Sequence, residues 1–146
     1  KQTPFHACHL RAGGRLVDFA GWQMPVQYAS ILDEVRRVRT GCGLYDLSHM
    51  GRVRIEGKDR VAAADRIFTN HIAKLRVGDI RYSLICNERG TVIDDVLVYG
   101  ESDAIFVVVN ASNTDRDLAH MRELVKGYDA RIVDLTEELA MCALQG

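Results

Sequence analysis

Two adjacent carboxylates, Asp94 and Asp95, lie inside a run of residues that otherwise has the pattern of a buried β-strand. Carboxylates are rarely fully buried unless a partner group pairs with them. Successive strand side chains point to opposite faces, so these acids cannot form a close catalytic pair. Desolvation on an apolar face raises the pKa of an unpaired carboxyl group, which is the environment that makes an acid useful in chemistry. The strand is a candidate site, and the competing interpretation is an aspartate that caps the turn at residues 87–90.

The cysteines and histidines give weaker signals. Four cysteines are widely spaced with no C-x-x-C pair, so the sequence predicts buried free thiols rather than a zinc ribbon or a redox dithiol. His6, Cys8 and His9 are close enough to suggest a metal site. Because no fourth ligand lies nearby, we expect no metal there.

Length and charge bound the class of protein. A chain of 146 residues with 47% hydrophobic content can bury a core of normal domain size. Its formal net charge of -1 leaves no basic field that could hold nucleic acid or an anionic membrane. No apolar run approaches the roughly 20 residues that span a bilayer. We therefore expect no nucleic-acid or membrane partner and a cytoplasmic location, or the mitochondrial matrix in a eukaryote.

Residues 1–50 are predicted to form the N-terminal part of a first subdomain. Glycines and Pro25 indicate an irregular entry over residues 1–28, with one short strand at residues 15–19. Ser30 precedes apolar residues at helical spacing, with acidic residues early, basic residues late and Gly41 at the end, which predicts a capped amphipathic helix. Residues 44–50 are predicted as a compact link. Residues 136–146 are predicted as the truncated start of a strand that returns to this subdomain.

Residues 51–135 alternate between strand and helix patterns. Short polar turns separate the middle strands, as hairpins require, and Ser112 is the predicted cap of the second helix. The predicted strands are residues 52–56, 80–86, 93–99, 104–109 and 130–135, and the predicted helices are residues 58–68 and 112–125. This β-α-β-β-β-α-β order predicts a ferredoxin-like α+β sandwich with helices on one face of an antiparallel sheet.

Four separated motifs resemble the aminomethyltransferase, or T-protein, family of the glycine cleavage system. They are residues 17–28 (VDFAGWQMPVQY), 44–50 (LYDLSHM), 90–99 (GTVIDDVLVY) and 108–112 (VVNAS), and the likeness extends over residues 3–146. The resemblance implies an enzyme that takes an aminomethyl group from the lipoyl arm of the H-protein. It implies tetrahydrofolate as the co-substrate, no metal, and methylenetetrahydrofolate, ammonia and the reduced lipoyl carrier as products.

The resemblance also implies roles for individual residues. The key acid of the family falls on Asp95, which is implied to polarise the reacting amine near the folate and to hold an iminium-like intermediate. Tyr82, Tyr99 and Asn110 match positions that line the pterin pocket, and Met50 matches a position at its wall. Strand alternation agrees, since it places Tyr99 on the face of Asp95. The alternatives are core packing for the tyrosines, gap filling for the methionine and a strand end at the asparagine.

The chain also differs from the family. Family enzymes are well over twice as long, and segments that supply a pterin-gripping glutamate, an arginine near the folate tail and a C-terminal domain are not found in these 146 residues. We therefore expect an N-terminal fragment that is inactive alone and that self-associates through an open edge. A folate-dependent demethylase of the same superfamily and a non-catalytic folate-binding module stay open as alternatives. The motif at residues 19–28 favours the aminomethyltransferase over the demethylase.

Overall fold

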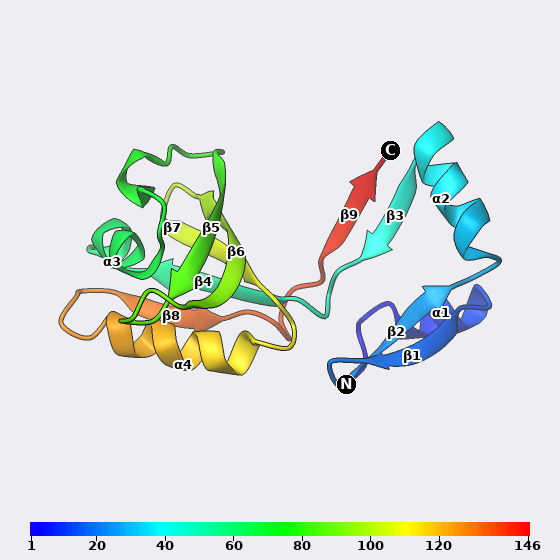
Figure 1. The fold of residues 1–146 in the computed structure, drawn as a ribbon, viewed down its shortest axis with the longest axis horizontal. Helices are drawn as coiled ribbons and strands as arrows, with labels where there is room; N and C mark the ends of the chain where they lie inside the picture. The colour runs from blue at the N-terminus through cyan, green and yellow to red at the C-terminus, as the bar shows by residue number, and fades with distance from the viewer. The chain divides into compact units, whose positions relative to one another are not determined.

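The computed structural model describes all 146 residues, which divide into two compact units. The first unit joins residues 1–49 to residues 139–146, and the second holds residues 50–138. Figure 1 shows the helices and strands of each unit. No helix is both long enough and apolar enough to cross a membrane. All the predicted site residues belong to the second unit.

The second unit is built on one antiparallel sheet of five strands in the order β5-β6-β7-β4-β8. Its elements are β4 (Gly51–Glu56), α3 (Arg60–Ile67), η1 (Ile72–Lys74), β5 (Ile80–Cys86), β6 (Val92–Gly100), β7 (Ala104–Val109), α4 (Thr114–Leu124) and β8 (Arg131–Asp134). The predicted β-α-β-β-β-α-β order and the ferredoxin-like fold class are therefore confirmed. The short 3-10 helix η1 is the one element of this unit that was not predicted.

One face of this sheet is covered by α3 and α4 and forms the hydrophobic core (Figure 1). Val96 and Val98 of β6 point to this face, as does Val107 of β7, and all are at most 2% exposed. They belong to one apolar cluster with side chains of the helices, among them Ala63, Ile67, Leu118 and Met121. Burying an aliphatic side chain of this kind stabilises a fold by about 1.5–3 kcal/mol. This face therefore holds the unit together.

The opposite face of β5 and β6 is open. Tyr82 of β5 stands opposite Leu97 of β6, and Asp95 stands opposite Leu84 in the same register. The side chains of Ile80 and Tyr82 are 55% and 61% exposed. Scattered exposed hydrophobic residues are ordinary, but a contiguous apolar surface around a carboxylate is typical of a ligand site or an interface.

Helix α4 begins later than predicted. Ser112 was predicted to cap it, whereas the helix begins at Thr114 and its N-cap is Asn113. The Asn113 side chain makes no capping hydrogen bond, and its amide donates to Asp94 at 2.5 Å. The prediction was wrong because a tertiary contact here outweighs the local preference of a serine for the cap position.

The first unit contains two small antiparallel pairs, β1 with β2 and β3 with β9. Its elements are α1 (His6–Arg11), β1 (Arg15–Phe19), β2 (Trp22–Gln27), α2 (Ile31–Thr40), β3 (Gly43–Asp46) and β9 (Cys142–Gln145). The predicted strand β1 is confirmed. The predicted helix is confirmed as α2. Ser30 caps it by accepting a hydrogen bond from the Asp33 backbone N–H at 3.2 Å, and Gly41 follows it as the C-cap residue.

Three elements of the first unit fall where an irregular entry or a link was predicted. These are α1, β2 and β3, so the prediction was wrong for those residues. Strand β2 contains Pro25, which cannot donate to a ladder and lowers the strand signal. A two-residue turn at Ala20 and Gly21, both with positive φ (53° and 79°), nevertheless joins β1 to β2 as a hairpin.

Candidate functional site

The strand register brings predicted site residues to one end of the five-stranded sheet. Leu97 of β6 stands opposite Val108 of β7, so Asp95 and Asn110 lie at neighbouring positions two residues further along. Gly51 of β4 stands opposite Val109, so Met50 leaves the sheet beside Asn110. Residues from the ends of three strands therefore meet at this edge.

Asp95 is held on the open face by two side chains. The Tyr82 hydroxyl donates to Asp95 Oδ2 at 2.9 Å, and Asn110 Nδ2 lies 3.3 Å from Asp95 Oδ1. Asn110 Nδ2 also donates to the backbone carbonyl of Asp95 at 3.0 Å. The hydrogen bond to Asp95 is the main cause that raises the pKa of Tyr82, followed by partial desolvation and the charges of both acids. Asp95 thus has a fixed orientation while its side chain stays exposed.

Tyr99 and Met50 are less closely tied to this cluster. Tyr99 shares the face of Asp95 but stands four residues along β6, which corresponds to about 13 Å. Its ring packs edge-on against Phe106, with the ring centroids 5.7 Å apart. The Met50 carbonyl accepts a hydrogen bond from the Arg52 guanidinium. The structure therefore joins Tyr82, Asp95 and Asn110 directly and places the other two on the same face or at the same end.

Asp94 faces the opposite side and is only 4% exposed. Asn110 donates to it twice, from its backbone N–H and from Nδ2, each at 3.0 Å, and Asn113 Nδ2 donates at 2.5 Å. Burial pushes the pKa of Asp94 upward, but hydrogen bonds from Asp117, Asn110 and Asn113 outweigh burial and hold the pKa below its usual value. The raised pKa that we expected for an unpaired carboxyl group on an apolar face is not found at Asp94, because this carboxylate is well paired.

Asp117 of α4 completes this buried cluster, and sequence reasoning missed it. Its side chain is fully buried and faces Asp94, and no N–H group donates to either carboxyl oxygen. Burial is the main cause that raises the pKa of Asp117 to about 8, with the Asp94 hydrogen bond and charge adding to it and Arg116 opposing it. Asp117 is four residues before the buried Met121, so an acid on the apolar stripe of the helix was the available signal.

A second polar cluster lies in the first unit. His9 is 6% exposed, with Nδ1 2.7 Å from the Tyr28 hydroxyl and Nε2 2.8 Å from Asp46 Oδ2. Both ring nitrogens of His9 are therefore used within the chain. No group of three or more His, Cys, Asp or Glu side chains lies close enough together to hold a metal ion.

The four cysteines are free thiols, as predicted. Their predicted burial is wrong, because Cys8, Cys42 and Cys142 are exposed and Cys86 is half-buried. Cys142 lies on the short strand β9, and Cys86 ends β5, so their neighbours do not enclose them.

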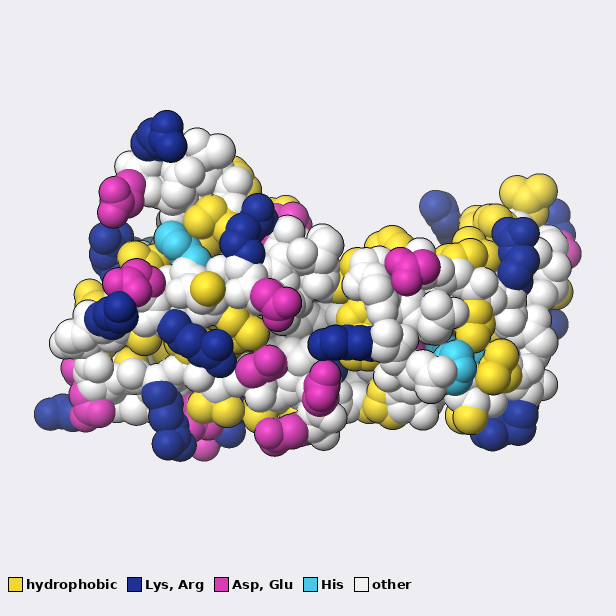
Figure 2. Space-filling model, turned by 90° about the horizontal axis from the view of Figure 1, so that it is seen from below, with side chains coloured by type: hydrophobic (Ala, Val, Ile, Leu, Met, Phe, Trp, Pro, Cys, Tyr) yellow, Lys and Arg dark blue, Asp and Glu magenta, His cyan; other side chains and the backbone are white.

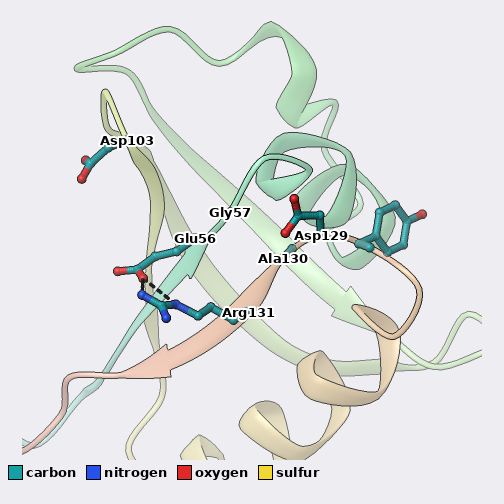
Figure 3. Close-up of a pocket in the computed structure, with 7 residues that line it drawn as sticks. Glu56, Gly57, Asp103, Asp129, Ala130 and Arg131 are labelled. Carbon is teal, nitrogen blue, oxygen red and sulfur yellow. Dashed lines mark hydrogen bonds and ion pairs between the residues drawn. The ribbon is translucent and has the colours of Figure 1, made fainter.

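The second unit also has a cavity that lies away from the predicted residues. It is a cavity of about 490 Å³ whose lining includes Glu56, Asp103, Asp129 and Arg131 (Figure 3). Arg131 pairs with Glu56 at 2.7 Å across it. Figure 2 shows acidic and basic side chains interspersed on the face it displays, without a patch of one sign. None of the predicted site residues lines this cavity.

Comparison with known proteins decides the family. The model of the GCVT N-terminal domain matches residues 5–146. The chain belongs to this family. The resemblance to the T-protein family that the four motifs indicated is therefore confirmed, and the match covers nearly the whole chain.

Relatives of this GCVT chain include two bacterial aminomethyltransferases. The proteins of Desulfitobacterium hafniense and Rubrobacter xylanophilus are 44% and 47% identical to it over its whole length, which is 40% and 39% of theirs. The crystal structure of glycine cleavage system aminomethyltransferase T from Bartonella henselae matches with a TM-score of 0.95 and 32% identity, over 100% of this chain and 40% of that one. The chain thus spans about 40% of the length of these relatives.

Proposed function

We propose that this chain is the part of a tetrahydrofolate-dependent aminomethyltransferase that holds the catalytic carboxylate, Asp95, against the reacting one-carbon unit. The observation that carries the proposal is the cluster in which Tyr82 and Asn110 both donate to Asp95 on the open face of the sheet. The names of the relatives support aminomethyl transfer over demethylation. The lipoylated H-protein is the proposed donor of the aminomethyl group.

The residues at this end of the sheet suit a pterin ring. Tyr82 and Leu97 offer exposed apolar surface beside a polar group, as ligand sites generally do. The Asn110 amide hydrogens are directed at Asp94 and Asp95, so its carbonyl oxygen is the atom left to accept a hydrogen bond from a ligand. Met50 and Tyr99 extend the same surface in this proposal.

Asp95 supplies negative charge where positive charge develops. Tetrahydrofolate, when bound, supplies the nucleophile that takes up the methylene unit while ammonia leaves and the reduced lipoyl carrier is released. The Asp95 carboxylate stabilises the positive charge that builds up on the transferred carbon and its amine. Its attraction grows once ligands exclude water from the open face, because the effective dielectric constant falls. Tyr82 and Asn110 hold the carboxylate in place before the reaction begins.

The test is Asp95→Ala in a full-length aminomethyltransferase that carries these 146 residues. We expect turnover to fall by roughly 100-fold or more, as when one preorganised electrostatic group is removed, while folate binding measured by calorimetry survives. Asp103→Ala is the matched control, since Asp103 is an aspartate whose side chain is 73% exposed on the β6–β7 turn. Full activity of Asp95→Ala would refute the proposal, and a methylated rather than methylene folate product would favour the demethylase.

A further inference from the structure

The buried cluster behind Asp95 connects three separate elements. Asp94 of β6 accepts hydrogen bonds from Asn110, at the end of β7, and from Asn113, at the start of α4. Asp117 reaches the same carboxylate from the first turns of α4, and its backbone N–H donates to the Asn113 carbonyl at 2.9 Å. The cluster therefore fixes the segment that carries Asn110.

Asp117 can be accommodated only with a proton. Its oxygens receive no donor from the chain, and the group they face is a carboxylate that three amide N–H groups already stabilise in its charged form. Two ionised carboxylates in contact inside a core repel each other strongly, whereas one proton between them gives a hydrogen bond. The charged groups that face Asp117 are Asp94 from β6 and Arg116 from its own helix. The Arg116 guanidinium is also committed to the Ile93 carbonyl.

Asn110 links this cluster to the open face, because its side chain contacts both Asp94 and Asp95. The same Nδ2 atom donates to Asp94 Oδ1 at 3.0 Å and lies 3.3 Å from Asp95 Oδ1. A rotation of the Asp94 carboxylate therefore moves the amide that holds Asp95. The contacts run from Asp117 to Asp94, then to Asn110 and Asp95, across the thickness of the sheet.

We propose that Asp117 is a positioning residue for the site on the open face: its protonated carboxyl group donates to Asp94 and thereby orients Asn110 and Asp95. The inference rests on the proposed function for the meaning of the Asp95 position. It requires no contact between Asp117 and any ligand. Loss of the Asp117 proton places two negative charges side by side and releases the Asn110 amide from its fixed orientation.

The first test is nuclear magnetic resonance on the 146-residue chain, without any ligand. We expect the Asp117 carboxyl carbon to titrate near pH 8, as burial and Asp94 dictate. Asp117→Asn keeps a donor toward Asp94, so the Asn110 side-chain amide signals stay at their wild-type positions. Asp117→Leu removes the donor, and exchange of those amide hydrogens with water becomes roughly 10-fold faster or more. Titration of Asp117 at its ordinary value, or unchanged Asn110 signals in Asp117→Leu, would overturn the inference.

The second test is the pH dependence of turnover in a full-length aminomethyltransferase that carries this segment. We expect wild-type turnover to decline above about pH 8 and Asp117→Asn to keep wild-type turnover at pH 7 without that decline. Asp117→Asn retains every other side chain of α4, so the comparison isolates the Asp117 carboxyl group. Asp117→Leu is expected to lower kcat/KM by roughly 10-fold or more, as a small misplacement of a catalytic group does.

The two proposals fail in different ways. A purely structural Asp117 would change the unfolding midpoint and leave the pH profile of turnover identical in wild type and Asp117→Asn. That outcome, together with an inactive Asp95→Ala variant, would overturn this inference and leave the proposed function standing. A fully active Asp95→Ala variant would remove the proposed function, while the resonance measurements would still decide whether Asp117 holds Asn110 through Asp94.

Discussion

The two faces of strand β6 use the same residue type in opposite ways. Asp94 points into the helix-covered core, is 4% exposed and accepts hydrogen bonds from Asn110 and Asn113. Asp95, the next residue, points to the open face, where Tyr82 and Asn110 hold it at the surface. The alternation of a strand alone assigns them to these environments. One carboxylate thus anchors the fold, and the other is available for chemistry.

Asn110 makes the two faces depend on each other. A buried carboxylate needs partners, because taking an unpaired charge out of water is very unfavourable. Asn110 meets that need at Asp94 with two N–H groups and at the same time reaches Asp95. The buried cluster around Asp94 therefore also helps to fix the orientation of the Asp95 carboxylate. The contrast predicts that substitutions on the two faces affect different measurable properties.

The largest difference is expected between Asp94→Ala and Asp95→Ala. Asp94→Ala removes the acceptor of the Asn110 backbone N–H and of the half-buried Asn113 amide, and it removes the partner of the buried Asp117 carboxyl group. We expect the free energy of unfolding to fall by about 3 kcal/mol or more, the usual result of leaving several buried polar groups unpaired. Asp95→Ala is expected to leave the urea midpoint nearly unchanged, since its side chain is exposed. Urea unfolding of the 146-residue chain, followed by circular dichroism, measures both.

Asp94→Asn is the control for charge at the buried position. It keeps the shape and one acceptor oxygen but loses the negative charge. Its free energy of unfolding should therefore lie between those of wild type and Asp94→Ala. Equal unfolding midpoints for Asp94→Ala and Asp95→Ala would contradict the conclusion that Asp94 stabilises the fold and that Asp95 does not.

The next expected effect is the pH dependence of stability. The pKa of Asp117 is about 8 in the folded chain and ordinarily 3.8, so between these values the folded chain holds a proton that the unfolded chain has lost. The free energy of unfolding therefore falls as pH rises through this window, by at most about 1.4 kcal/mol per pH unit for this one group. The lowered pKa of Asp94 acts in the opposite sense, and its contribution is lost as pH falls below the ordinary value.

The difference between wild type and Asp117→Asn isolates this proton. The variant has no carboxyl group at that position, so its unfolding free energy should lack the decline between pH 4 and pH 8 that Asp117 causes. The measurement is urea unfolding at several pH values for both proteins. Parallel pH curves for the two would show that Asp117 does not hold the extra proton.

The sequence predicts the scaffold of the second unit well, because its signals are local. Alternation and short polar turns predict β5 and β7 to the residue. Alternation also predicts that Asp94 and Asp95 face opposite sides. Strand β3 was missed, since the strand that it pairs with, β9, is distant in the sequence.

The contacts of the buried cluster could not be predicted, because its members are distant in sequence. The apolar stripe of α4 could show that Asp117 is buried, but its contact with Asp94 on another element, which adds to the effect of burial on its pKa, has no local signal. The late start of α4 has the same origin, since Asn113 gives its amide to Asp94. The positions of Met50 and Tyr99 relative to a bound folate stay predictions.

The smallest expected effect separates the two tyrosines of the open face. Tyr82→Phe removes the hydroxyl that donates to Asp95 at 2.9 Å, whereas Tyr99 packs on Phe106 further along β6. In a full-length aminomethyltransferase we expect Tyr82→Phe to lower turnover by about three- to tenfold, the range expected for one hydrogen bond. Tyr99→Phe is the matched control and should leave turnover unchanged at saturating folate. Equal losses for the two variants would mean that the tyrosines act through the ligand-binding surface, and that Asn110 alone holds Asp95 in place.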